Sequence, residues 1–388
     1  MQDLRGDWRF PTAILAGPGR LGELPGRARD LGARRVLVVS DPGVARLPVF
    51  SALTEGLRAE GIAVAAFTDT HPDPLAGDVA SGCAALRAHE AELVVALGGG
   101  SALDCGKAIA LAAASDRPLW DFEITNTPPP LDRPILPIFA VPTTAGTGSE
   151  VGRAAVITDM ETARKVILLH PSMLPRLVIL DPEATIGLPA NLTAWTGMDA
   201  LAHNLEAYCV RAYHPMADGV AVEGMRLIKH WLAAACEEPR NIAARSGMLA
   251  AAAMGATAFQ KGLGAVHSLS HPIGLHCHAH HGLTNGVLMP YVLEYNRPVI
   301  EERIVDLARG LGIDGGFDGF RGWLTGLRER LGIPHRIDAL GVTAPMLDRL
   351  AGEAFRDPNT PDNPRAADAA AMRRMLEAAL SGRLAGLA

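Results

Sequence analysis

The segment ELVVALGGGSALD, residues 92–104, decides how the first half of this chain folds. Residues 92–97 form a short apolar run, three consecutive glycines follow it, and Ser101 begins a helical pattern. An apolar run without alternation is expected of a strand that is covered on both faces. The segment therefore predicts a buried strand that turns tightly into a helix.

The same strand pattern recurs along the first half, at residues 35–40, 63–67, 138–141 and 177–180. Helical patterns lie between these runs, for example at residues 48–60 and 79–90. Strands that alternate with helices form parallel sheets joined by crossovers. We therefore expect an open α/β sheet in this half of the chain.

The pattern changes after about Asp181, where long segments rich in Ala, Leu and Met replace the strand signals. We expect helices at residues 192–209, 216–236, 240–259, 299–311 and 366–380. A chain of 388 residues is long enough for two domains with separate cores. We predict an α/β nucleotide-binding domain over residues 1–185 and an all-helical, metal-binding and catalytic domain over residues 186–388.

Composition and charge narrow the class of protein. The chain is 48% apolar and 20% charged, as ordinary soluble globular proteins are. Its 36 basic and 42 acidic residues give a formal charge of −6 and are spread without long blocks. This balance argues against nucleic acid or an acidic membrane surface as the main partner.

The chain carries no recognisable export or membrane signal. Residues 1–7 are polar and lack the apolar run of a signal peptide. We expect no apolar stretch that approaches the roughly 20 residues needed to span a bilayer. The five cysteines are odd in number and have no short paired spacing, which fits reduced thiols. These features favour a cytoplasmic protein.

The glycines of the first loop, Gly98, Gly99 and Gly100, allow the backbone to approach a pyrophosphate closely. The helix that Ser101 begins would add free N–H groups and the positive end of its dipole. The alternative is a tight turn without a ligand. The fingerprint G-x-G-x-x-G is absent as such, so the loop is not the standard dinucleotide signature.

A second loop of small residues, PTTAGTGSE at residues 142–150, also follows a strand. Its hydroxyls suit hydrogen bonds to ribose and phosphate, and they belong to Thr143, Thr144, Thr147 and Ser149. Alone, the loop could be a solvated turn. Together the two loops form glycine-rich edges at the carboxyl ends of strands, where open α/β sheets bind ligands.

A carboxylate, Asp41, stands after the strand expected at residues 35–40. It could accept hydrogen bonds from an adenosine ribose and would repel a 2′-phosphate, which favours NAD over NADP. The alternative role for Asp41 is to cap the N-terminus of a helix.

Four residues of the second half form a candidate metal site. Asp199 and His203 are four residues apart, which places them on one face of a helix. His267 and His281 lie in a histidine-rich segment farther along. One carboxylate and three imidazoles suit a borderline divalent ion such as Fe(II) or Zn(II), and not calcium or magnesium. Taken singly, each of these residues is more often a surface or satisfied core residue.

These motifs resemble those of the iron-containing, or group III, alcohol dehydrogenases, from residue 10 to about residue 380. The likeness rests on four motifs in the family's order: the first loop with Asp104 and Lys107, the loop at 142–150, residues 197–200 with His203, and His267, His271 and His281. His267 and His281 are 14 residues apart, as in the family.

The resemblance implies a dehydroquinate-synthase-like fold with the active site in a cleft between the two domains. It implies that Asp199, His203, His267 and His281 bind a divalent metal, Fe(II) in first place and Zn(II) or Mn(II) as alternatives. His271 matches a nearby non-ligand histidine, a candidate for proton relay. Homodimers with paired N-terminal strands are common in the family, so a homodimer is also implied.

The resemblance also implies an NAD(H) site. Thr143, Thr144, Thr147 and Lys165 match positions that contact the cofactor. We add the residues that the loops themselves indicate: Asp41, Gly98, Gly99, Gly100, Ser101, Asp104 and Ser149. A divalent ion lowers the pKa of an alcohol hydroxyl and polarises an aldehyde carbonyl. Hydride then passes to or from the nicotinamide, which carries the redox chemistry.

Two basic residues bear on the substrate. Arg153, in Gly152-Arg153-Ala154, and Lys261, before Gly262, stand where the sequence resembles the family's 4-hydroxybutyrate dehydrogenases. Cations there could hold a carboxylate, phosphonate or sulfonate, as succinate semialdehyde would present. The alternative is structural: Lys261 would cap a helix end and Arg153 would join a surface ion pair.

Other functions of this fold stay open. One is a dehydrogenase of short neutral alcohols or diols, such as glycerol. Another is a metal-dependent lyase of the dehydroquinate synthase type, and a third is a non-catalytic metal- or nucleotide-binding protein. The complete set of Asp and three His residues disfavours a metal-free maleylacetate reductase.

Overall fold

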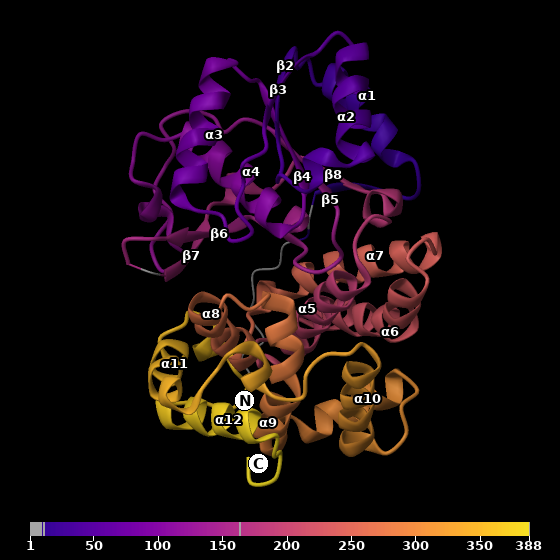
Figure 1. Cartoon of the computed structure of the whole chain (residues 1–388), viewed down its shortest axis with the longest axis vertical. Coiled ribbons are helices and arrows are strands. Elements are labelled where there is room, and N and C mark those ends of the chain that lie inside the picture. Colours follow the sequence, from indigo (N-terminus) through magenta and orange to yellow (C-terminus); the bar gives the residue numbers. More distant parts are fainter. Residues whose placement is uncertain (1–9, 11, 163, 388) are drawn as a thin grey trace. The chain divides into compact units, whose positions relative to one another are not determined.

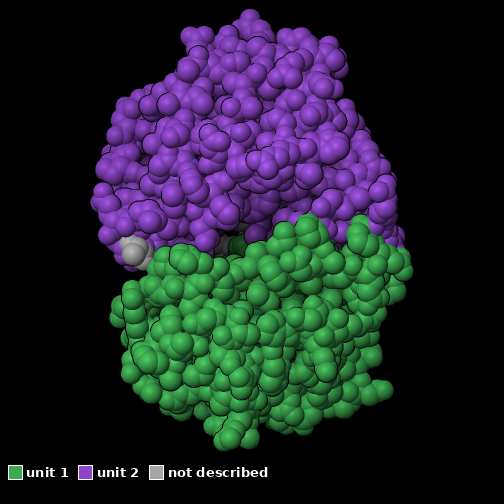
Figure 2. Space-filling view, in the orientation of Figure 1, with its two compact units in different colours: residues 1–9, 189–239, 250–388 green, residues 10–188, 240–249 purple. Residues whose placement is uncertain are grey.

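A computed structural model describes residues 10, 12–162 and 164–387. The chain divides into two compact units, which Figure 2 colours separately. We call residues 10–188 and 240–249 the sheet unit, and residues 189–239 and 250–388 the helical unit. The domain boundary between residues 185 and 186 stays a prediction. The calls made on residues 1–7 lie outside the described residues.

The sheet unit is built on six parallel strands in the order β1-β8-β5-β4-β2-β3. The strands of the unit, including a separate antiparallel pair formed by β6 and β7, are β1 (Ala13–Ala16), β2 (Arg35–Val39), β3 (Ala63–Phe67), β4 (Leu93–Gly98), β5 (Ile138–Pro142), β6 (Ala154–Asp159), β7 (Arg164–Leu169) and β8 (Leu177–Leu180). All five expected strands are present, and the expectation of a parallel sheet is confirmed.

Helices cover both faces of this sheet, as Figure 1 shows. They are α1 (Leu24–Asp30), α2 (Pro48–Ala59), α3 (Ala76–Ala88) and α4 (Gly100–Ala113). Successive residues of β2 point to opposite faces, so Val36 and Val38 pack in a cluster with α1 and α2 residues. Leu37 and Val39 pack in a second cluster with α3 and α4. Burial on both sides is the reason that residues 36–39 of β2 are all apolar.

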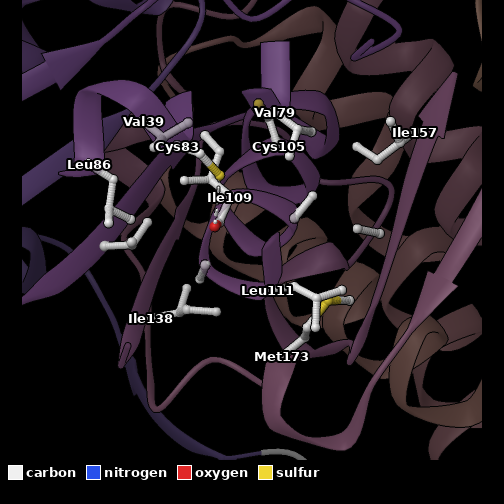
Figure 3. Packing of buried hydrophobic residues seen from close by; sticks show 14 of the residues in the cluster. Val39, Val79, Cys83, Leu86, Cys105, Ile109, Leu111, Ile138, Ile157 and Met173 are labelled. Carbon is white, nitrogen blue, oxygen red and sulfur yellow. Dashed lines mark hydrogen bonds between the residues drawn. The ribbon is translucent and has the colours of Figure 1, made fainter. Parts of the chain in front are cut away.

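The cluster under α3 and α4 contains two of the five cysteines, Cys83 and Cys105 (Figure 3). Burial raises the pKa of the Cys83 thiol to about 11 and that of Cys105 to about 12. Both therefore pack as neutral apolar groups at physiological pH. None of the five cysteines forms a disulfide in the structure.

Three strands were not expected from the sequence. β1 is four residues long and pairs only with β8, which lies far along the chain. β6 and β7 pair with each other and do not join the main sheet. β1 is too short to give a clear local pattern, whereas β6 and β7 are six residues long and mix polar with apolar residues, unlike the covered strands.

The helical unit contains no strand among its described residues, so the expectation of an all-helical second half is confirmed. Its helices, together with α7, whose first residues belong to the sheet unit, are α5 (Ala190–Cys209), α6 (Pro215–Glu237), α7 (Ile242–Ala258), α8 (Ala265–Cys277), α9 (His281–Gly310), α10 (Gly316–Arg330), α11 (Leu347–Phe355) and α12 (Ala369–Ser381).

Three of these helices, α8, α10 and α11, and the first half of α9 were not expected. Pro272 interrupts the pattern of α8, and Pro290 and Pro298 lie inside α9. A proline removes a backbone donor and frees carbonyls of the preceding turn. Arg328 compensates for part of this loss in α9, since its buried guanidinium donates to the Val287 carbonyl at 3.1 Å.

Helix α7 with the short turn after it is long and apolar enough, at residues 242–261, to cross a bilayer by composition. This stretch was overlooked in the sequence. In the structure 61% of the apolar window is buried inside the molecule. Buried core helices of soluble proteins commonly pass the same test of composition.

Candidate metal centre and cofactor loops

The metal ligands expected from the sequence converge in the helical unit. Asp199 and His203 lie one turn apart on α5, His267 lies on α8, and His281 begins α9. The Asp199 Oδ1 atom lies 3.8 Å from His203 Nε2 and 3.9 Å from His267 Nε2. It lies 3.5 Å from His281 Nε2. Three of the expected ligands, Asp199, His203 and His267, thus cluster, and His281 lies beside Asp199.

This donor set fits a divalent ion. Nε2 and carboxylate oxygens bind such ions at about 2.0–2.2 Å, which places neighbouring ligands of a tetrahedron about 3.4 Å apart. The observed separations of 3.5–3.9 Å are slightly wider. Asp199, His203 and His267 are all buried and offer ligand atoms within 4.8 Å of one another. The side chain of His281 is 30% exposed, so the ion would be reached from its side.

A buried carboxylate, Glu206, supports this set from behind. It lies on α5, seven residues after Asp199 and therefore on the same face of the helix. Its Oε2 lies 2.5 Å from His267 Nδ1, and its Oε1 accepts the Val266 backbone N–H at 2.8 Å. Because a carboxylate only accepts, the imidazole carries its proton on Nδ1 and presents Nε2 to the ligand set.

The environment of His267 perturbs its pKa. Burial by itself lowers this pKa, but the hydrogen bond and charge of Glu206, with the charge of Asp199, outweigh burial. The net effect raises the pKa of His267 above its usual value in the metal-free chain. Metal binding therefore competes with a proton at this ring, which makes affinity depend on pH.

The amide of Asn285 lies among the ligand atoms. Asn285 follows His281 by one helical turn on α9. Its Nδ2 donates to Asp199 Oδ1 at 2.8 Å and lies 3.1 Å from His281 Nε2 and 3.4 Å from His267 Nε2. Its Oδ1 is buried and has no hydrogen-bond partner in the structure.

His271, the expected proton relay, stands beside the ligands without joining them. Its ring stacks on that of His281 at 5.5 Å between centroids. Its Nδ1 lies 2.7 Å from Asp357 Oδ2, and Asn359 donates twice to the other oxygen of that carboxylate. Burial alone would raise the pKa of Asp357, but the charge and hydrogen bond of His271 lower it overall. Asp357 thus fixes the orientation of the His271 ring.

The three supporting residues were missed in the sequence. Glu206 and Asn285 carried a usable signal, since each follows a ligand by three or four residues on one helix face. Asp357 carried none, because it lies 86 residues after the histidine that it contacts.

In the sheet unit, the two expected loops lie side by side at the carboxyl ends of β4 and β5. The chain runs from β2 to β3 on one side and then returns to place β4 on the other side of β2. Such a switch point in strand order opens a crevice for ligands. The first loop leaves β4 at this point, and the Thr143 backbone N–H donates to the Gly98 carbonyl at 2.9 Å.

Two glycines of the first loop are required by space. Gly98 has φ 154°, and a Cβ added there would lie 2.6 Å from Ala102 Cβ. A Cβ on Gly100 would lie 2.5 Å from Thr147 Cγ2, whereas one on Gly99 would make an ordinary contact of 3.4 Å with Thr144 Cγ2. The two loops therefore pack so closely at Gly100 that a side chain there would clash, and they bring backbone N–H groups to the start of α4.

Asp41 makes local contacts of the capping kind, and its contact with a ribose stays a prediction. Its Oδ1 accepts the Gly43 and Val44 backbone N–H groups at 2.8 and 3.0 Å, so it caps a short turn of 3₁₀ helix. Its Oδ2 faces Gly98, where an added Cβ would lie 3.2 Å away. One oxygen of Asp41 thus borders the first loop, as a ribose contact requires.

Other residues assigned to the cofactor make internal contacts. Asp104 accepts from the Ser149 hydroxyl at 2.5 Å and from the Val156 backbone N–H at 2.9 Å. The buried Lys107 pairs with Asp104 at 3.0 Å and donates to the Ser149 carbonyl at 3.0 Å. These bonds tie the second loop to α4. Asp104 and Ser149 therefore shape the loop, and their contact with a cofactor stays a prediction.

Ser101 and Lys165 also have partners within the sheet unit. The Ser101 hydroxyl donates to the Pro72 carbonyl, and Lys165 Nζ lies 2.6 Å from Asp73 Oδ1. Both contacts lead to the turn before α3. A role in cofactor binding would require Lys165 to share its charge between Asp73 and a phosphate.

Glu150 ends the second loop and is fully buried. Its Oε1 has no hydrogen-bond partner in the structure. Burial raises the pKa of Glu150 to about 7, although its own backbone and the charge of Lys107 act in the opposite direction. This carboxyl therefore titrates near neutral pH.

The two basic residues considered for the substrate differ in their surroundings. Lys261 is buried, with its Nζ 2.5 Å from Asp218 Oδ1 and 3.5 Å from the Tyr208 carbonyl near the end of α5. These contacts fit the structural alternative for Lys261, in which the lysine caps the end of a helix. Burial lowers the pKa of Lys261, and Asp218 opposes that effect. Arg153 lies just before β6 and is partly exposed.

Comparison with known families settles the class. Residues 11–182 match the family model described as iron-containing alcohol dehydrogenase, and residues 193–380 match its C-terminal counterpart. The chain belongs to the iron-containing alcohol dehydrogenase family. Membership makes it an oxidoreductase, and the family's NAD and iron are the cofactors predicted from its sequence.

Individual relatives cover the whole chain. It is 37% identical over 378 residues to the 4-hydroxybutyrate dehydrogenase of Cupriavidus necator, spanning 95% of this chain and 98% of that one. The solved structure of a 1,3-propanediol oxidoreductase superposes with a TM-score of 0.93 at 34% identity, covering 97% and 100% of the two chains. The sulfoacetaldehyde reductase of Bifidobacterium kashiwanohense, solved in complex with NAD⁺, gives 0.88 at 29% identity, covering 97% and 99%.

Proposed function

We propose that this iron-containing alcohol dehydrogenase transfers hydride between NAD(H) and a short primary alcohol or aldehyde that carries an anionic group at its far end. The single observation that carries the reaction is the cluster of Asp199, His203 and His267, with His281 Nε2 3.5 Å from Asp199 Oδ1. A cytoplasmic location and a homodimer belong to the same proposal.

Each residue has a stated part in this reaction. The four ligands would hold the divalent ion, which when bound supplies Lewis-acid polarisation of the substrate oxygen. His271, oriented by Asp357, would receive or deliver the proton of that oxygen at its Nε2. The glycine loop and the threonines of the second loop would bind the pyrophosphate and ribose of NAD(H), with Asp41 favouring NAD over NADP.

The anionic end of the substrate would be held by Arg153. Lys261 is already paired with Asp218 inside the helical unit, so the hypothesis rests on the arginine alone. Two relatives have names that specify an anionic substrate, a carboxylate for 4-hydroxybutyrate and a sulfonate for sulfoacetaldehyde. A guanidinium presents two parallel donors, which suits either group.

A paired substrate experiment tests this proposal. NADH oxidation by the iron-loaded protein is measured with succinate semialdehyde and with butanal, which has the same chain length without the carboxylate. The Arg153→Ala variant should raise KM about tenfold or more for the first substrate and leave it within twofold for the second. Lys261→Met is the matched control, because it removes a cation whose partner is internal, and it should shift both KM values equally.

The results separate the possible substrates. Equal effects of Arg153→Ala on both substrates would remove the anionic end from the proposal. The runner-up is then a dehydrogenase of neutral alcohols or diols, which the similarity to a 1,3-propanediol oxidoreductase favours. A protein that loads iron and binds NADH but reduces no aldehyde in a broad panel would contradict the dehydrogenase itself and favour the lyase or a non-catalytic role.

A further inference from the structure

The helices that carry the expected metal ligands are joined by side-chain hydrogen bonds that follow one pattern. α5 carries Asp199 and His203, and Glu206, three residues after His203, bonds a ligand on α8. α9 carries His281, and Asn285 one turn later bonds a ligand on α5. In both cases a residue that follows an expected metal ligand on one helix forms a hydrogen bond to an expected ligand on another helix. Neither bracing residue is itself among the four expected ligands.

We propose that Glu206 and Asn285 are positioning residues that hold His267 and Asp199 in metal-binding geometry and thereby set the affinity for the metal. The inference rests on the metal site of the proposed function. It adds to that function an account of how the ligand side chains are held in place.

Glu206 acts on His267 in two ways at once. Its Oε2 accepts the Nδ1 proton, so Nε2 keeps its lone pair and faces Asp199 Oδ1. Its Oε1 accepts the Val266 N–H in the first turn of α8, one residue before the ligand. The Ala265 N–H is taken by Asn363 Oδ1 at 3.1 Å, so residues from outside α8 accept its first two N–H groups. The same carboxylate therefore fixes both the ring and the backbone that carries it.

The side-chain amide of Asn285 lies among the expected metal ligands. Its Nδ2 lies within hydrogen-bond distance of Asp199 Oδ1 and His281 Nε2, and 3.4 Å from His267 Nε2. The side chain is completely buried, and its Oδ1 is left without a partner. A buried amide that leaves its own oxygen unpaired is costly, which argues that its nitrogen is placed for the ligands and not for packing. It keeps Asp199 from turning away when no ion is present.

The purely structural alternative is that Glu206 serves only to cap α8 and Asn285 only fills the core. Under that alternative, substitutions would lower the stability of the fold and leave the affinity of the folded protein for metal unchanged. Partners of metal ligands typically change metal affinity by about 10–100-fold when they are removed. Affinity and stability must therefore be measured separately.

The experiment uses the full chain stripped of metal and titrated with Zn(II) or Co(II) against a chelating dye, without substrate or NAD. Thermal unfolding of the metal-free protein is recorded alongside. The variants are Glu206→Gln, Glu206→Ala and Asn285→Ala. Two controls remove equally buried polar groups from α9: Glu294→Gln, whose carboxylate pairs with Arg321, and Thr284→Ala, whose hydroxyl donates to the His280 carbonyl.

We expect metal affinity to fall about tenfold in Glu206→Gln and Asn285→Ala and about 100-fold in Glu206→Ala, with the controls within twofold of the wild type. The Co(II) absorption spectrum should also change in Glu206→Gln, because the His267 ring is released. Affinities of the folded Glu206→Gln and Asn285→Ala proteins equal to the controls would overturn the inference. A wild-type chain that binds no divalent ion would contradict the proposed function itself.

Discussion

The candidate metal centre and the candidate cofactor loops differ in what makes them suitable for binding. The metal centre uses buried side chains on long helices, and Asp199 and His267 work because of the atoms that they present. The loops use the absence of side chains, since Gly98 and Gly100 leave space that any Cβ would fill. One region is thus specified by residue chemistry and the other by backbone shape. Substitutions should therefore damage them in different ways.

The two regions also differ in how burial acts. In the metal centre a buried polar group has a hydrogen-bond partner, as in the contact of Glu206 with His267. At the end of the second loop, Glu150 is buried with one oxygen unpaired, and its pKa rises to about 7. A paired buried charge holds a geometry, whereas an unpaired one makes its surroundings sensitive to pH.

The largest effect is expected when an expected metal ligand is removed. Asp199→Ala removes the only carboxylate from the ligand set. Metal affinity should fall by more than the roughly 100-fold that the loss of an outer partner produces, and NADH oxidation should cease. NADH binding, measured by its fluorescence, should stay within twofold. A parallel loss of NADH affinity would show that the two regions are not independent.

A smaller effect is expected when backbone shape is changed. Gly100→Ala places a methyl group 2.5 Å from Thr147 Cγ2 and forces the two loops apart. Overpacking of this kind costs about 1–3 kcal/mol, so the dissociation constant of NADH should rise roughly five- to 150-fold while metal affinity is retained.

The control for this variant is Gly22→Ala in the same unit, where an added Cβ meets nothing within 4 Å. Thr147→Ser removes the crowding methyl group and should partly restore NADH binding when combined with Gly100→Ala. No change in affinity for Gly100→Ala would mean that the loop does not touch the cofactor.

The smallest effect concerns pH. The pKa of Glu150 is raised from 4.5 to about 7 on folding, so the folded chain holds this proton more tightly than the unfolded chain does. The resulting stability is present below about pH 4.5 and is lost as the pH rises through about 7. It amounts to at most about 3 kcal/mol.

Glu150→Gln keeps the shape and removes the titration. The melting temperature of the wild type should therefore fall between pH 5 and pH 8 by a few degrees more than that of the variant. Glu161, in the exposed turn between β6 and β7, provides the matched control, since Glu161→Gln should leave the pH dependence unchanged. Identical profiles for the wild type and Glu150→Gln would show that the carboxyl does not titrate in this range.

Much of the fold could be read from local pattern. The apolar runs of β2, β4 and β5 predicted a covered parallel sheet, because burial on both faces leaves no polar position in a strand. β1 was missed because four residues give little local pattern, and β6 and β7 were missed because they mix polar and apolar residues. The first half of α9 was missed because its two prolines conceal a helix that tertiary packing maintains.

The candidate site, like the fold, has one part that local sequence pattern predicted and another that only the structure revealed. The sequence by itself determined the family and predicted four metal ligands and two cofactor loops, because these depend on residue types at fixed local spacings. Only the tertiary structure decided that Glu206 braces His267, that Asn285 reaches Asp199, and that Lys261 is committed to Asp218. Those contacts join separate helices, and the partner of a side chain across such a gap is determined by packing and not by spacing along the chain.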